Sequence, residues 1–96
     1  MENLNHNQLK DIVANSLEQL SERNFLIALS GGIDSILLLN LVNEINIHKE
    51  YQIRAIHINH NIAKNSDAMQ NHCINICKKL NINLTVKNIN IIEKSN

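Results

Sequence analysis

The chain contains only two glycines and no proline, and the two glycines are adjacent, at Gly31 and Gly32. They interrupt an otherwise apolar stretch, FLIALSGGIDSILLL, which covers residues 25–39. Glycine adopts backbone angles that other residues avoid, and it lets a ligand approach the main chain closely. The chain therefore concentrates its backbone freedom at one point, and the polar residues around the glycines form the candidate functional loop.

Hydrophobic spacing predicts three helices that alternate with three strands. The expected helices cover residues 7–23 and 36–45 and a third segment whose apolar face is formed by Met69, Cys73, Ile76, Cys77 and Leu80. The expected strands cover residues 25–29, 52–59 and 84–92, and a polar loop over 61–66 ends at an N-cap, Asn65 or Ser66.

Strands separated by helices pair in parallel through right-handed crossovers. The expected fold class is therefore α/β: an open parallel sheet, Rossmann-like, with helices on both faces and with the first strand buried on both sides. In such sheets ligands bind beyond the carboxyl ends of the strands. The glycines follow the first strand, so the sequence and the fold rule point to the same place.

Composition narrows the class of protein. The 96 residues suffice for one small domain or part of one, and nine basic side chains balance nine acidic ones. A neutral chain has no overall field that attracts nucleic acid or an anionic membrane, so a polyanionic partner needs a local site. No apolar run is long enough to span a membrane and no signal peptide is evident, which predicts a cytoplasmic protein with no membrane partner. Two cysteines form no disulfide framework, in agreement with a reducing compartment.

The loop has the composition of an anion site. Adjacent glycines allow successive N–H groups to point into one concavity, the following helix adds about half a positive charge, and Ser30 and Ser35 carry hydroxyl donors. Asp34 would repel an anion unless a divalent cation lay between them, which predicts Mg²⁺ held by Asp34 and phosphate oxygens. The pattern matches neither a Walker loop nor GxGxxG. The alternative is purely structural: Ser30 or Asp34 caps the helix and the glycines only turn the chain.

Two other groups of residues resemble metal sites. His57 and His60 lie three residues apart on an expected strand, where the period of two places them on opposite faces, so ligand contact or solvent exposure is favoured over chelation. Cys73 and Cys77 share a helix face with apolar residues, which favours buried core thiols over a zinc site.

The motif SGGIDS after an apolar strand resembles the pyrophosphatase loop of the N-type ATP pyrophosphatases, or PP-loop enzymes, which cleave ATP between the α and β phosphates and adenylate an acceptor. NAD synthetases, GMP synthetases, asparagine synthetases and tRNA thiolation enzymes share this loop. The segments RAIHINHNI (residues 54–62), Ser66-Asp67-Ala68 and HCINIC (residues 72–77) are similar to the tRNA(Ile)-lysidine synthetase family.

This resemblance implies the remaining expectations. The ATP site would consist of Ser30, Gly31, Gly32, Ile33, Asp34 and Ser35, with Asp34 as the catalytic and Mg²⁺-binding residue and with Ala55, Ile56 and His57 near the adenine. The full enzyme would be a ligase that activates the wobble cytidine of tRNA(Ile) with ATP and attaches L-lysine, releasing AMP and pyrophosphate. Residues 1–96 would form the N-terminal part of one ATP-binding domain, with the tRNA-binding domains and lysine contacts elsewhere.

Two further expectations concern this chain alone. Alone it would make no lysidine. Strands that normally cover the first strand would be missing, so the edge of residues 25–29 would be exposed. The isolated chain would then either self-associate along this edge or be stable only beside the rest of its polypeptide. Two alternative functions are another PP-loop enzyme, such as a tRNA thiolation enzyme, and a non-catalytic adenine-nucleotide-binding module like the universal stress proteins.

Overall fold

The computed structural model describes residues 4–60 and 65–89. Its elements are α1 (His6–Gln19), β1 (Asn24–Ala28), α2 (Ile33–Ile45), the short 3₁₀ helix η1 (Asn46–His48), β2 (Gln52–Asn59), α3 (Ser66–Leu80) and β3 (Asn83–Asn88). The expected alternation of three helices and three strands is confirmed, and β2 has the predicted bounds. No helix in these two ranges has the length and apolar character needed to cross a membrane.

The start of α1, both ends of β1 and the start of β3 lie one residue from their predicted positions, and larger errors occur at the end of α1 and the start of α2. Helix α1 ends at Gln19 because Ser21 takes a left-handed φ of 54°, which turns the chain toward β1. Helix α2 begins at Ile33 rather than at residue 36, since Gly32 is its N-cap. Strand β3 ends at Asn88, and residues 90–92 of the predicted third strand lie outside the described residues.

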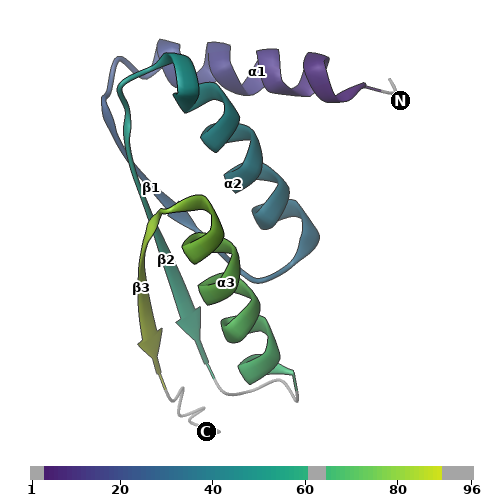
Figure 1. The fold of residues 1–96 in the computed structure, drawn as a ribbon, viewed down its shortest axis with the longest axis vertical. Coiled ribbons are helices and arrows are strands. Elements are labelled where there is room, and N and C mark those ends of the chain that lie inside the picture. The colour runs from purple at the N-terminus through teal and green to yellow at the C-terminus, as the bar shows by residue number, and fades with distance from the viewer. Residues whose placement is uncertain (1–3, 61–64, 90–96) are drawn as a thin grey trace, which may run out of the picture.

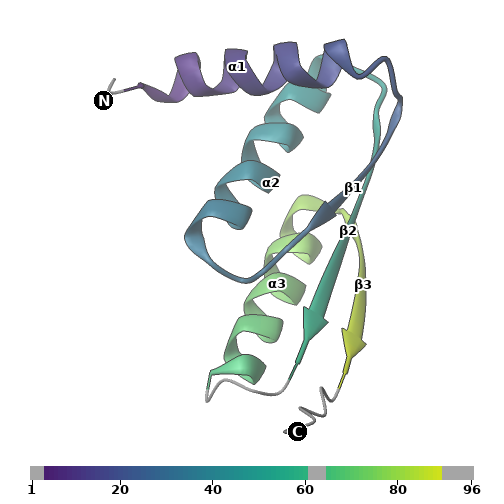
Figure 2. The same cartoon turned by 180° about the vertical axis from the view of Figure 1, so that it is seen from behind.

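The sheet is parallel throughout and has the order β1-β2-β3. Register pairs Ala28 of β1 with Ile56 of β2, and Ile56 with Thr85 of β3. Figures 1 and 2 show the three strands running the same way, with α2 and α3 both beginning at the end where the strands finish. The open parallel sheet is therefore confirmed, and β1 is an edge strand of the described sheet.

Helices on both faces of the sheet were expected, but the described helices share one face. Alternate side chains show this: Ile27 and its register partner Ala55 are 8% and 1% exposed, whereas Leu26, the residue before Ile27 on β1, is 60% exposed. Strand order explains the difference, because right-handed crossovers that advance in one direction across a sheet place their helices on the same side. Consequently β1 is buried on one face only, and the expectation of a strand buried on both faces was also wrong for the described residues.

The core lies between this covered face and helices α2 and α3. Its buried members are Ile27, Leu29, Leu39, Val42, Ala55, Cys73 and Cys77. Burial of such side chains is the main favourable contribution to folding. It also fixes the first turns of α2 and α3 beside the ends of the strands.

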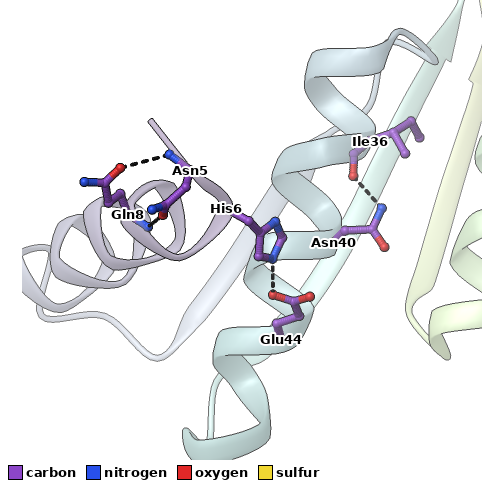
Figure 3. Close-up of polar contacts among 6 residues, drawn as sticks. All are labelled: Asn5, His6, Gln8, Ile36, Asn40 and Glu44. Atoms are coloured by element: carbon purple, nitrogen blue, oxygen red, sulfur yellow. Dashed lines mark hydrogen bonds and ion pairs between the residues drawn. The ribbon is translucent and has the colours of Figure 1, made fainter. Parts of the chain in front are cut away.

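Helix α1 packs at the opposite end of the molecule, across α2 (Figures 1 and 2). A capping box between Asn5 and Gln8 starts α1, and His6 Nε2 lies 2.8 Å from a carboxylate oxygen of Glu44 on α2 (Figure 3). At the other end of α1, Lys49 donates to Glu18 at 2.7 Å, and this hydrogen bond and the positive charge lower the pKa of Glu18. Both pairs are exposed, so they orient α1 more than they stabilise the fold.

Candidate functional site

The candidate loop, residues 30–35, lies where the sequence predicts it, at the carboxyl end of β1. Leu29 extends the pairing one residue past the strand, because its N–H donates to the Ile56 carbonyl at 2.8 Å. The loop then begins at Ser30, and α2 starts at Ile33. The loop is therefore anchored directly to the second strand.

The two glycines have different roles. Gly31 has a φ of 88°, and a Cβ at this position would lie 2.8 Å from the Cβ of Met69 on α3. Gly32 has a φ of −83°, which any residue adopts, and a Cβ there would meet only the Ser30 Oγ, at 3.3 Å. Of the two glycines, only Gly31 therefore takes a left-handed angle, and one such residue completes the turn.

The two serine hydroxyls hold the loop together. Ser35 Oγ accepts from the Ser30 N–H at 3.1 Å and donates to the Gly32 carbonyl at 3.2 Å. Ser30 Oγ lies 3.1 Å from Ser35 Oγ and accepts from the Gly32 N–H at 3.2 Å. When the Ser35 hydroxyl donates to the Gly32 carbonyl, the Ser30 hydroxyl donates to Ser35 Oγ, and each of the four contacts then has one donor and one acceptor. The hydroxyls, expected as donors to a ligand, bond within the loop in this structure.

The first turn of α2 presents its amides at the loop. The first N–H groups of a helix have no intrahelical acceptor, and no hydrogen bond from those of Ile33, Asp34 or Ser35 occurs within the described residues. The positive end of the helix dipole lies at the same place. Gly32 is the N-cap and no side chain caps the helix, so the alternative in which Ser30 or Asp34 serves as the cap was wrong.

Asp34 lies exposed in this first turn. A carboxylate beside unpaired amides suits a Mg²⁺ ion that takes one ligand from the protein and the others from phosphates and water. Among residues 4–60 and 65–89, no three His, Cys, Asp or Glu side chains are grouped to hold a metal by themselves. The donor set therefore fits a cation that arrives with a phosphate ligand and does not fit a protein-only metal centre.

A pocket of about 360 Å³ lies beside the loop, at the ends of β1 and β2 and the start of α3. Its walls are formed by Ala28, Leu29, Ser30, Ile56, His57, Ile58, Asn59, His60, Ser66 and Met69. Of the three residues predicted near the adenine, Ile56 and His57 line this pocket. Ala55 does not, because it points into the core, where it is 1% exposed.

The pocket also joins residues that sequence reasoning separated or missed. His57 and His60 were predicted on opposite faces, but both line it, since β2 ends at Asn59 and His60 lies beyond the strand. Asn59 and Met69 were missed as wall residues. Asn59 is 2% exposed and its amide donates to Gln70 Oε1 at 2.8 Å. A polar residue ending a buried strand is a signal that could have identified it.

The cysteines are core residues, as predicted. Cys73 and Cys77 are 0% and 2% exposed and belong to the apolar cluster under the sheet. Burial raises the pKa of both thiols, and the nearby Cys77 raises that of Cys73 further. Since the thiolate is the reactive form of cysteine, these side chains are poor nucleophiles in the folded protein.

A family model described as a PP-loop domain matches residues 1–96. The tRNA(Ile)-lysidine synthase of Buchnera aphidicola subsp. Acyrthosiphon pisum is 43% identical over 88 residues, which cover 92% of this chain and 19% of that relative. For the tRNA(Ile)-lysidine synthase of Haemophilus influenzae strain 86-028NP, identity is 34% over 88 residues, which cover 88% of this chain and 20% of the relative.

The chain thus spans about a fifth of the length of these relatives. Among solved structures, the U34-tRNA thiolase NcsA from Methanococcus maripaludis, with its [4Fe-4S] cluster, superposes with a TM-score of 0.65 over 85% of this chain and 30% of that one. Its sequence identity is 18%, so the match concerns the fold alone.

We expect Gly31→Ala to destabilise the protein more than Gly32→Ala. The left-handed angle alone costs about 1–2 kcal/mol for a residue with a Cβ, and the added methyl would collide with Met69. Urea denaturation of both variants measures the free energies of unfolding. Equal losses in the two variants would contradict the assignment of the turn to Gly31.

Proposed function

Because the chain belongs to the PP-loop domain family, we propose that residues 30–35 bind the phosphates of ATP. The observation that carries the proposal is the first turn of α2, where amides without acceptors, the helix dipole and the close backbone of Gly31 and Gly32 converge. The loop needs no lysine in this arrangement, because main-chain N–H groups supply the hydrogen bonds. Ser30 and Ser35 fix the loop and can redirect their hydroxyls to a bound phosphate.

The same proposal assigns Mg²⁺ to Asp34. When bound, the ion would neutralise phosphate charge next to this carboxylate and make the pyrophosphate a better leaving group. Asp34 supplies a negatively charged oxygen without blocking the amides, since it projects from the exposed side of the first turn. Asp34 would hold the ion near the phosphates, and this is the catalytic role that we propose for it.

The adenosine part of ATP would occupy the pocket at the strand ends. A volume of about 360 Å³ with largely apolar walls suits a nucleoside. Ile56 and His57 lie in the wall and form our candidates for contact with the base. Ala55 would support them from the core behind.

We infer that this chain is the nucleotide-binding part of a cytoplasmic tRNA(Ile)-lysidine synthetase. Two observations support this: the identity with lysidine synthases over most of the chain, and their greater length. In the proposed reaction, ATP adenylates the wobble cytidine of tRNA(Ile) and releases pyrophosphate, and an amine of L-lysine then displaces AMP. Residues 1–96 would form the N-terminal part of the ATP-binding domain, and the tRNA and lysine contacts would lie in the remainder of a longer polypeptide.

A tRNA thiolation enzyme is the second candidate, favoured by the shared fold of the solved thiolase. The cysteines argue against it. Sulfur transfer through cysteine needs a reactive thiolate, whereas Cys73 and Cys77 are buried and their thiol pKa values are raised. A non-catalytic nucleotide-binding module remains the third candidate, and product formation distinguishes it from both enzymes.

We expect Asp34→Asn to retain the fold and to lose the magnesium dependence of ATP binding. The substitution removes the charge that attracts the cation but leaves the amides of α2 in place. Calorimetric titration of ATP with and without Mg²⁺ measures the effect, with Asp11→Asn on exposed α1 as the matched control. Equal magnesium enhancement in the wild type and the Asp34 variant would exclude Asp34 as the metal ligand.

We expect the full gene product to form AMP and pyrophosphate from ATP only with tRNA(Ile) present, and to form lysidine when L-lysine is added. Chromatographic detection of both products and of the modified nucleoside gives the measurement. Thiolated product would instead support the second candidate, and ATP binding without turnover would support the third. The purified 96-residue chain, assayed in parallel, should bind ATP weakly and form no lysidine.

We propose in addition that the isolated chain self-associates along β1. This strand has a neighbour on one side only in the described sheet, and Leu26 on its open face is 60% exposed. Unpaired strand edges with apolar side chains are templates for pairing. Light scattering should give a mass above that of a monomer, and Leu26→Lys should lower it by placing a charge at the edge. A monomeric wild type would contradict the proposal.

A further inference from the structure

His57 combines near-complete burial with a place in the pocket wall. Its side chain on β2 is 4% exposed, yet it lines the pocket at the strand ends. Nδ1 lies 2.6 Å from the carbonyl oxygen of Leu29 and 3.6 Å from Sγ of Cys73. The ring therefore lies between β1, α3 and the pocket, directly behind the start of the phosphate loop.

The contact with Leu29 determines the tautomer. A carbonyl oxygen only accepts hydrogen bonds, so at 2.6 Å Nδ1 must carry the proton and donate it. An unprotonated Nδ1 would place its lone pair against a lone pair of the Leu29 carbonyl oxygen in a buried site. The weaker contact with Cys73 could not compensate for this repulsion. In the neutral ring with its proton on Nδ1, Nε2 is a hydrogen-bond acceptor.

Nε2 is open to the pocket. This nitrogen has no hydrogen-bond partner within residues 4–60 and 65–89. Every fully buried polar side-chain atom of these residues does have a partner. Nε2 must therefore reach solvent, and the cavity that His57 lines gives it that access. The pocket thus contains an acceptor whose orientation is fixed from behind by the Leu29 carbonyl.

An acceptor in this position distinguishes the two purines. Adenine carries an amino donor on its six-membered ring at the position where guanine carries a carbonyl oxygen acceptor. A bound guanine would bring two acceptors together in a largely apolar pocket and leave both unpaired, which is a costly arrangement. The chemistry of the wall therefore favours adenine.

On the basis of the proposed ATP site, we propose that His57 is a specificity-determining residue whose Nε2 accepts a hydrogen bond from the 6-amino group of adenine. Its Nδ1–H meanwhile fixes Leu29, the residue before the phosphate loop. One imidazole then links base selection to the position of residues 30–35. Selection of ATP over GTP follows from a single side chain.

Two substitutions separate the two nitrogens. In His57→Asn the amide can replace the Nδ1–H donor to Leu29 but offers nothing at the Nε2 position. In His57→Gln the longer amide places an oxygen near the Nε2 position but loses the bond to Leu29. His48→Asn, on η1 at the far end of α2, is the matched control.

Calorimetric titrations with ATP, GTP and purine riboside triphosphate, all with Mg²⁺, test the proposal. We expect His57→Asn to weaken ATP binding about tenfold, the effect of one lost hydrogen bond. The same variant should bind GTP more tightly, because the opposing acceptor is gone, and should bind purine riboside triphosphate, which lacks the amino group, with little change. We expect His57→Gln to keep the preference for ATP but to melt at a lower temperature. The control should match the wild type in both respects.

An unchanged ratio of ATP to GTP affinity in His57→Asn would overturn the proposal and leave the ATP site intact. If that variant does not fold, the wild type still decides, because equal affinity for ATP and purine riboside triphosphate would overturn it equally. A wild type that binds none of the three nucleotides would overturn the proposed function and this inference with it.

Discussion

The backbone of Leu29 is the point on which the arrangement of the site depends. Its N–H donates to Ile56 and its carbonyl accepts from His57, so β2 holds both polar groups of this residue. The loop begins at the next residue and thus cannot shift without breaking bonds to the second strand. Gly31 then turns against Met69 of α3. Two strands and two helices meet at the loop, and the core beneath them keeps the amides of α2 in a fixed position.

The sequence predicted those parts of the fold that local patterns determine. The bounds of β2 follow from its β-branched residues, and the buried face of α3 follows from the spacing of Cys73 and Cys77. The end of α1 did not follow, because Leu20 continues the helical spacing while the left-handed Ser21 ends the helix in practice. The side of the sheet that the helices cover depends on strand order, which hydrophobic spacing does not encode.

The candidate site likewise has parts that the sequence predicts and parts that it does not. The loop was predictable because its residues are contiguous, and their glycines, hydroxyls and carboxylate point to one chemistry. The pocket was not, because its wall combines the ends of two strands with Met69 from a helix. Only the fold shows that a Cβ on Gly31 would collide with Met69, and that His57 turns one nitrogen to a backbone carbonyl and leaves the other open. Contacts between distant residues give these side chains their roles.

The fold alone does not select the reaction. The solved thiolase shares the architecture at 18% identity, and a phosphate loop at the strand ends can serve many acceptors. Among the described residues, the loop presents unpaired amides that suit a phosphate, whereas both thiols lie in the core with raised pKa values. The 96 residues of the chain also carry no net charge. Without a long-range field, the attraction of these residues for an anion comes from local groups, among them the unpaired amides in the first turn of α2.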